Sequence, residues 1–241
     1  MGLVFKNMRF KNKNVIITGS ASGIGKKLYE DFAAEGARSI GFDIAEGSDY
    51  CVDVSNYKLI ETAVQDILSR YQHIDIVVNC AGGNPSRIRH ENVSFEQLSI
   101  DTIDWGVGVN FKGPLYMARA CIGHMMERNS GVIINVGSIS GVTGSAGAVD
   151  YAAEKSGLKG LTRSLALLGA PYNVRCCMVT PGPVLTRPEM AKMPTPLNRA
   201  AQVGEISDFI MYLCSDKAGF ITGSEHLIDG GRSCGGLKHE K

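Results

Sequence analysis

Short runs of aliphatic and β-branched residues alternate along the chain with longer segments in which apolar residues recur every three or four positions. A short continuous apolar run indicates a strand buried on both faces, whereas the longer spacing indicates an amphipathic helix. The first helical segment places Ile24, Leu28 and Phe32 on one face and ends at Gly36. We predict strands over residues 14–18, 39–43, 50–54, 75–79, 131–138, 173–180 and 225–229. We predict helices over residues 24–35, 57–71, 102–128, 151–168 and 203–215.

This alternation predicts an α/β fold built on a doubly wound parallel sheet of about seven strands, flanked by helices. No linker, repeat or low-complexity segment interrupts the pattern, so we expect one domain over residues 1–241. Residues 187–200 hold three prolines and two methionines and are expected to form a short lid-like loop. We expect residues 232–241 to form a frayed tail.

A glycine-rich turn, Gly19-Ser-Ala-Ser-Gly-Ile-Gly25, joins the first predicted strand to the first predicted helix. Glycines let the backbone approach a pyrophosphate closely, and the start of a helix offers free N–H groups and the positive end of its dipole. A strand, a glycine-rich turn and a helix in this order therefore predict a nucleotide site.

An acidic residue, Asp43, ends the second predicted strand. In a βαβ nucleotide unit, an acid at this point hydrogen-bonds the adenosine ribose of NAD and repels the additional phosphate of NADP. Neither the turn Gly19–Gly25 nor the segment Ile44–Glu46 contains a lysine or an arginine. These features favour NAD over NADP.

Tyr151 and Lys155 lie four positions apart in a predicted helix, so both project from one face. A free tyrosine has a pKa of about 10, and a neighbouring cation lowers that pKa by favouring the anion. A tyrosine brought toward neutrality can exchange a proton with an alcohol or ketone oxygen. Ser138 closes the fifth predicted strand, where its hydroxyl could hold the same oxygen. The spacing alone also fits a half-buried tyrosine beside a solvated lysine, so the other motifs must decide.

The composition argues against several other classes of protein. The net charge of +1 gives no electrostatic basis for binding nucleic acid or an anionic membrane. The chain has no apolar run of about 18 residues and no signal-peptide pattern at its start. Its seven cysteines are scattered without metal-ligand spacing, which suits a reducing compartment. We expect a cytoplasmic protein without a metal and without a nucleic-acid or membrane partner.

Together the motifs resemble those of the short-chain dehydrogenase/reductase family over essentially the whole chain, which implies a Rossmann-type fold. The motifs that carry the resemblance are Thr18-Gly-x-x-x-Gly-Ile-Gly25, Asp43, Asp53-Val54, Asn79-x-Ala-Gly82, Asn110, Ser138, Tyr151-x-x-x-Lys155 and Pro181-Gly-x-Val-x-Thr186. The glycine spacing is unlike that of the sugar-nucleotide epimerase branch, and the Tyr–Lys spacing is unlike that of bacterial enoyl reductases. The resemblance therefore favours an alcohol dehydrogenase or ketone reductase.

The resemblance also implies a role for each matching residue. Tyr151 would be the general acid/base, Ser138 would hold the substrate oxygen, and Asn110 would anchor a water in a proton relay. Lys155 would lower the pKa of Tyr151 and bind the nicotinamide ribose. Cofactor binding would fall to Gly19, Ser22, Gly23, Ile24, Gly25, Asp43, Asp53, Val54, Asn79, Ala81, Gly82, Tyr151, Lys155, Pro181, Val184 and Thr186. Members of the family generally form tetramers or dimers through two long helices, here 102–128 and 151–168.

Three features depart from the family pattern. Cys80 stands where a second asparagine is usual, and Glu154 stands where a small residue is usual. One position along a helix turns a side chain by about 100°, so we expect Lys155 to keep its role despite Glu154. The segment between Thr186 and the helix at 203–215 is also short, which leaves the substrate wall undefined.

The main hypothesis is an NAD-dependent oxidoreductase that transfers a hydride between nicotinamide and a small-molecule substrate with a secondary alcohol or ketone; sugars, hydroxy acids, acyl thioesters and steroids all remain open as substrates. An NADPH-dependent ketone or 3-oxoacyl reductase is an alternative of the same class. A non-catalytic nucleotide-sensing or scaffold protein is an alternative of another class. We expect the basic run at residues 87–90 to be a solvated loop. Arg187 could meet a carboxylate of the substrate, but we favour a solvated loop position for it.

Overall fold

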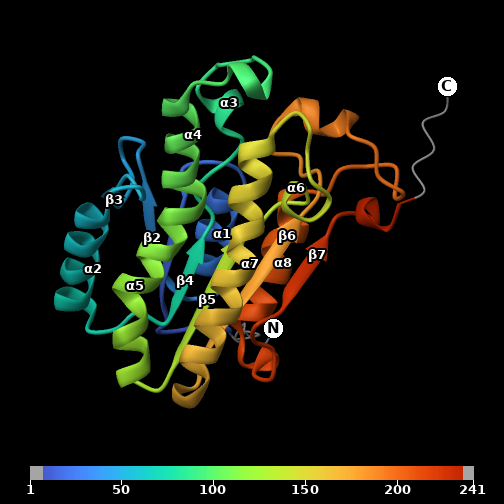
Figure 1. Cartoon of the computed structure of the whole chain (residues 1–241). Helices are drawn as coiled ribbons and strands as arrows, with labels where there is room; N and C mark the ends of the chain where they lie inside the picture. The colour runs from blue at the N-terminus through green and yellow to red at the C-terminus, as the bar shows by residue number, and fades with distance from the viewer. Residues whose placement is uncertain (1–7, 236–241) are drawn as a thin grey trace.

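The computed structural model describes residues 8–235, within which seven strands form one sheet. All neighbouring strands are parallel, in the order β3-β2-β1-β4-β5-β6-β7 (Figure 1). The strands are β1 (Asn14–Thr18), β2 (Arg38–Asp43), β3 (Tyr50–Cys51), β4 (Ile76–Asn79), β5 (Gly131–Val136), β6 (Val174–Pro181) and β7 (Glu225–Ile228). This arrangement confirms the predicted α/β fold with a doubly wound parallel sheet.

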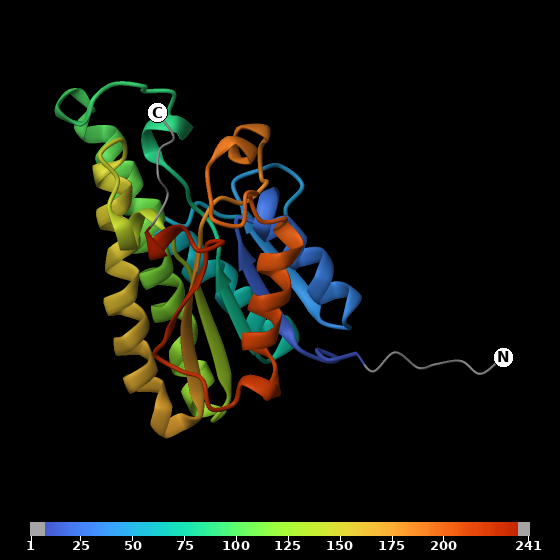
Figure 2. The same cartoon turned by 90° about the vertical axis from the view of Figure 1, so that its right-hand side faces the viewer.

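Helices cover both faces of the sheet, as the side view in Figure 2 shows. On one face, α1 (Gly23–Ala34) packs beside α8 (Val203–Cys214). The other face is covered by α2 (Tyr57–Tyr71), α5 (Gly113–Glu127) and α7 (Val149–Gly169). No helix within residues 8–235 is long and apolar enough to cross a membrane.

Neighbouring residues of one strand enter different hydrophobic cores. In β1, Ile16 packs into the core beneath α2, α5 and α7, whereas Val15 and Ile17 pack into the core beneath α1 and α8. All three side chains are fully buried. Successive side chains of a strand point to opposite faces, so a sheet covered on both faces needs apolar residues at consecutive positions. This requirement explains the continuous apolar run in the sequence of β1.

The helix predicted over residues 102–128 is not regular along its whole length. α4 (Ile100–Gly106) passes into a π-helical turn, Val107–Lys112, before α5 begins. Pro114, at the start of α5, has no N–H to donate to the carbonyl of Asn110, which removes one α-helical hydrogen bond at this point. The irregularity therefore lies just before Gly113-Pro114.

Several short elements differ from the sequence predictions. β3 covers only the first part of the strand predicted over residues 50–54. A 3₁₀ turn, Arg232–Cys234, lies in the predicted frayed tail, whose residues 236–241 fall outside the described part of the chain. The periodicity did not predict three short helical elements, namely α3 (Pro85–Ile88), α6 (Ser140–Thr143) and a 3₁₀ turn, Pro188–Lys192, inside the lid-like segment.

The carboxyl ends of β1 and β4 lie side by side where the strand order of the sheet reverses. The Thr18 hydroxyl oxygen accepts hydrogen bonds from the backbone N–H groups of Cys80 and Ala81, each at 3.0 Å. The two backbones are so close that a Cβ on Gly19 would lie 2.8 Å from the Cα of Ala81. Ligands of open α/β sheets bind in the crevice at such a switch point. The fold therefore places the glycine-rich turn and the Asn79–Gly82 turn beside one crevice.

A buried polar bridge joins the two central strands to α7. Asn79 Nδ2 donates to Asn135 Oδ1 at 2.8 Å, and Asn135 Nδ2 donates to Thr162 Oγ1 at 2.9 Å. None of these three side chains is more than 2% exposed. Because an unpaired polar group at a buried site would lower the stability of the fold, these hydrogen bonds hold the three side chains in fixed orientations.

We expect Asn135→Ala to lower the free energy of unfolding by about 2 to 3 kcal/mol, because Asn79 and Thr162 would lose a partner while remaining buried. Urea denaturation followed by circular dichroism measures this change. Asn92→Ala is the matched control, because Asn92 is exposed and its side chain has no hydrogen bond within residues 8–235. Equal denaturation midpoints for the two variants would contradict the prediction.

Candidate active site

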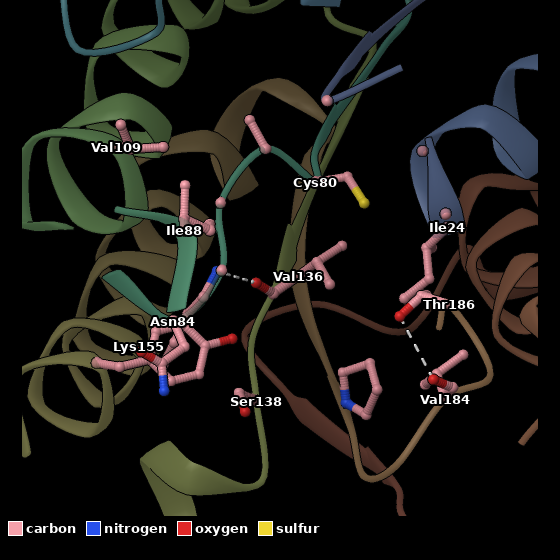
Figure 3. Close-up of a pocket in the computed structure, with 18 of the residues that line it drawn as sticks. Ile24, Cys80, Asn84, Ile88, Val109, Val136, Ser138, Lys155, Val184 and Thr186 are labelled. Atoms are coloured by element: carbon pink, nitrogen blue, oxygen red, sulfur yellow. Dashed lines mark hydrogen bonds between the residues drawn. The ribbon is translucent and has the colours of Figure 1, made fainter. Parts of the chain in front are cut away.

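One cavity of about 730 Å³ opens at the carboxyl ends of the strands. Figure 3 shows Ser138 and Lys155 on one side of it, with Ile24, Val184 and Thr186 on the other. The predicted site residues that line the cavity are Gly19, Ser22, Gly23, Ile24, Gly25, Asp43, Asp53, Val54, Ala81, Gly82, Ser138, Tyr151, Lys155, Pro181, Val184 and Thr186. The structure thus brings together most of the residues that the sequence predicted.

The glycine-rich turn has the shape of a cradle for an anionic group. Gly19 and Gly23 adopt positive φ angles of 70° and 54°, which favour glycine. A Cβ on Gly25 would overlap the carbonyl oxygen of Gly19. α1 begins at Gly23, and the preceding Ser22 makes no side-chain capping hydrogen bond. The first N–H groups of this helix are therefore available to a phosphate.

Asp43 is tied to the backbone on both of its carboxylate oxygens. Its Oδ2 accepts from Ala21 N at 2.9 Å, and its Oδ1 accepts from Ala45 N at 3.1 Å. These bonds fix the carboxylate between the end of β2 and the glycine-rich turn. The cationic side chains among residues 8–235 that line the cavity are Arg87, Lys155 and Arg187, and none of them forms a hydrogen bond or an ion pair with Asp43.

Tyr151, Ser138 and Lys155 form the other end of the cavity. Lys155 is 3% exposed and donates from Nζ to the carbonyl oxygen of Val136 at 2.9 Å. Burial lowers the pKa of Lys155 to about 8, so its ammonium is mostly charged at neutral pH. Burial raises the pKa of Tyr151, and hydrogen bonding to Ser138 opposes that rise.

The raised pKa of Tyr151 is opposite in direction to the shift that the sequence predicted from Lys155. The Nζ atom of Lys155 lies 5.9 Å from the centre of the Tyr151 ring and is directed to the backbone of Val136. In this arrangement, the loss of water around the phenol has a larger effect than the neighbouring ammonium.

Two predicted site residues do not line the cavity. The side chain of Asn79 is directed to Asn135 within the sheet. Asn110 is fully buried in the π-helical turn, and its Oδ1 accepts from Gly83 N at 2.9 Å while its Nδ2 donates to Gly83 O at 3.0 Å. Asn110 therefore holds the backbone that follows β4, and its side chain does not contact the cavity.

Glu154 is a buried residue of the site region whose importance the sequence did not reveal. Its Oε2 accepts from Asn110 Nδ2 at 2.7 Å, while its Oε1 is buried without a partner in the described residues. The carboxyl group occupies space that exists because residue 106 is a glycine, since a Cβ on Gly106 would collide with Oε1. Burial, with a smaller contribution from Asp150, raises the pKa of Glu154 to about 7, and the bond from Asn110 opposes this rise.

Comparisons with known proteins agree with this geometry. The family model for short chain dehydrogenases matches residues 13–196. A 3-oxoacyl-[acyl-carrier-protein] reductase of Thermotoga maritima is 32% identical over 93% of this chain and 99% of its own length. A trans-4-hydroxycyclohexanecarboxylate dehydrogenase of Sinomonas cyclohexanicum is 34% identical over 92% of this chain and 84% of its own length. The crystal structure of gox2181 matches with a TM-score of 0.86 and 29% identity, covering 95% of this chain and 98% of that one.

The chain therefore belongs to the short-chain dehydrogenase/reductase family, and it is an oxidoreductase. The family uses NAD(P), and the residues of the cavity fit such a dinucleotide. The cradle at Gly19–Gly25 suits a diphosphate, and the carboxylate of Asp43 lies beside it, bonded to Ala21 N. Within residues 8–235, no group of three His, Cys, Asp or Glu side chains could hold a metal ion.

We expect Glu154→Gln to stabilise the protein above pH 7 and to have little effect near pH 5. The raised pKa means that the folded state retains a proton between pH 4.5 and about 7 that the unfolded state releases, so the wild type loses stability as the pH rises through this window. A shift of this size corresponds to about 3 kcal/mol, and glutamine keeps an acceptor for Asn110.

Urea denaturation at pH 5, 6, 7 and 8 measures the difference between the Glu154→Gln variant and the wild type. Glu127→Gln is the control, because Glu127 is exposed on the last turn of α5. A stability difference for Glu154→Gln that stays constant across these pH values would contradict the prediction.

Proposed function

We propose that the protein is an NAD-dependent oxidoreductase that transfers a hydride between nicotinamide and the carbon of a secondary alcohol or ketone. The observation that carries this proposal is that Tyr151, Ser138 and Lys155 line the same cavity as the glycine-rich turn and Asp43. An acid/base pair at one end and a dinucleotide cradle at the other are the two parts that hydride transfer to or from an alcohol needs.

The chain's own groups account for the proton. In the oxidation direction, the Tyr151 phenolate accepts the hydroxyl proton of the substrate while the Ser138 hydroxyl donates a hydrogen bond to the same oxygen. Lys155 keeps a positive charge beneath the phenol ring at neutral pH, which favours the phenolate. In reduction, the phenol returns the proton to the developing alkoxide. When NAD is bound, its nicotinamide would supply or accept the hydride.

Asp43 supports NAD as the cofactor. Its carboxylate is fixed by two backbone hydrogen bonds, and no lysine or arginine within residues 8–235 forms an ion pair with it. A 2′-phosphate would therefore meet a negative charge without a compensating arginine or lysine. The name of the Thermotoga maritima relative favours the alternative of a 3-oxoacyl reductase. A scaffold or sensor without activity has no use for the three groups around the substrate oxygen.

We also propose a cytoplasmic homotetramer or homodimer acting on a small-molecule alcohol or ketone. Leu115 on α5, together with Leu167 and Leu168 on α7, leaves apolar surface exposed on the two long helices. Such surface suits contact with a second copy of the chain. All seven cysteines are free, which suits a reducing compartment.

Replacing Tyr151 with phenylalanine should lower kcat by about 100-fold or more, because the proton would lose its acceptor while the ring remains. The dissociation constant of NADH, measured by the fluorescence of the bound nucleotide, should stay within about twofold of the wild type, because the cradle is untouched. Tyr172→Phe, at an exposed site beyond α7, is the control. Near-normal turnover by the Tyr151→Phe variant would refute the proposed mechanism.

Replacing Asp43 with alanine should weaken NADH binding by about tenfold or more and should improve the relative binding of NADPH, because a charged hydrogen-bond acceptor and a repulsive charge are both removed. Titrations with both nucleotides at one salt concentration measure the change. Glu46→Ala removes an exposed acid three positions further along and should leave the preference unchanged. An unaltered preference in the Asp43→Ala variant would show that Asp43 does not select the cofactor.

A further inference from the structure

Two arginine side chains line the same cavity as Tyr151 and Ser138, although the sequence predicted both to be solvated loop residues. Arg87 belongs to α3, which begins with Asn84 as its cap and Pro85 at its first turn. Its Nη2 atom lies against the turn after β4. A Cβ built on Gly83 would be 3.1 Å from this atom. Arg187 directly follows Thr186 on the opposite loop.

Neither guanidinium is neutralised by a close partner. Within residues 8–235, the guanidinium of Arg87 has no hydrogen bond and no ion pair, although its backbone N–H donates to Asn84 Oδ1. Arg187 has one distant ion pair, 3.9 Å from its Nε to Oε2 of Glu189, whose side chain is 74% exposed. An exposed pair at this distance contributes little, because water screens it.

The two arginines also act on each other. The pKa of Arg87 is lowered, first by partial burial and next by the positive charge of Arg187, so the groups lie within electrostatic range of each other. Tyr151 is within the same range of Arg87. Glu189 also acts on both arginines, from an exposed position. Two like charges that line one cavity repel each other, and an anion placed between them relieves that repulsion.

We propose that the substrate carries an anionic group, a carboxylate or a phosphate, which Arg87 and Arg187 bind while the reacting oxygen rests on Tyr151 and Ser138. Arginine presents a planar fork of N–H donors that matches both kinds of anion in a bidentate manner. Ile88, Met190 and Met193 also line the cavity and suit a short apolar body between the two ends of the substrate. This inference deepens the proposed oxidoreductase function and rests on it.

A cofactor diphosphate is the rival anion, because Thr186 lies close to the glycine-rich turn. Its Cγ2 atom is 3.2 Å from the position of a Cβ on Gly23. Arg87, however, comes from the loop after β4 and lies against Gly83, on the side of Tyr151. A test of the proposal must therefore measure substrate binding and cofactor binding separately.

The experiment compares two pairs of ketones as substrates for reduction with NADH. Acetoacetate is paired with its methyl ester, and dihydroxyacetone phosphate is paired with dihydroxyacetone, so each pair differs mainly by its charge. The variants are Arg87→Met and Arg187→Met. The matched control is Lys192→Met, which removes one positive charge from the lid-like segment at an exposed residue outside the cavity.

We expect kcat/KM for at least one charged ketone to exceed that of its neutral partner by about tenfold or more. Each arginine variant should lose about tenfold to a hundredfold on the charged ketone, as expected for a lost hydrogen bond to a charged group. The neutral ketones, the Lys192→Met variant and the dissociation constant of NADH should be unaffected. Which pair shows the effect distinguishes a carboxylate substrate from a phosphate substrate.

Binding of the charged ketones to the complex of NADH with the Tyr151→Phe variant, measured by calorimetry, provides a readout without turnover. If the charged ketones bind in a way that depends on Arg87 but the wild-type protein does not reduce them, this inference would stand and the proposed function would fail. Equal behaviour of charged and neutral ketones, or no binding of either charged ketone, would overturn the inference. The inference would also be overturned if the arginine variants weakened NADH binding but left kcat/KM for the charged ketones unchanged.

Discussion

The close approach of β1 and β4 at their carboxyl ends is the constraint on which the site depends. The hydroxyl of Thr18 accepts two backbone N–H groups from the turn after β4, and Gly19 leaves no room for a side chain between the two backbones. Asn110 holds the next part of the same turn through both amide atoms of its side chain. One short stretch of backbone is thus fixed from two sides, and it separates the dinucleotide cradle from the groups around Tyr151.

The site combines this rigidity with buried charge. Lys155 and Glu154 are both almost fully buried. Burial lowers the pKa of Lys155 and raises the pKa of Glu154, and both shifts favour the neutral form of the side chain. Burying such groups destabilises the fold, so the two apolar cores on either side of the sheet must offset that cost. The carbonyl of Val136 accepts a hydrogen bond from Lys155, and the amide of Asn110 donates one to Glu154. These two bonds reduce the free energy that is lost by burying the two groups.

The sequence predicted the sheet, the long helices and most of the cavity wall, because these depend on local periodicity and on short motifs. The helix predicted over residues 57–71 matches α2, since its apolar spacing lies within one segment. Glu154 was not recognised as a buried group, because its place depends on Gly106, which is remote in sequence and adjacent in space. The signal for α3 was present in Asn84-Pro85, a cap followed by proline. The juxtaposition of Arg87 with Arg187 had no such signal, because it depends on how two loops are placed by different strands.

The π-helical turn between α4 and α5 makes the length of the chain as important here as the identity of its residues. Such a turn holds one residue more than an α-helical path of the same extent. Removing a single residue from Val107–Lys112 would allow a regular α-helix to form across this segment, and the bulge that carries Asn110 would be lost. Asn110 and Gly83 would then no longer face each other. Among relatives, the exposed residues of the segment equivalent to Val107–Lys112 should therefore vary freely, whereas the number of residues in this segment should be preserved.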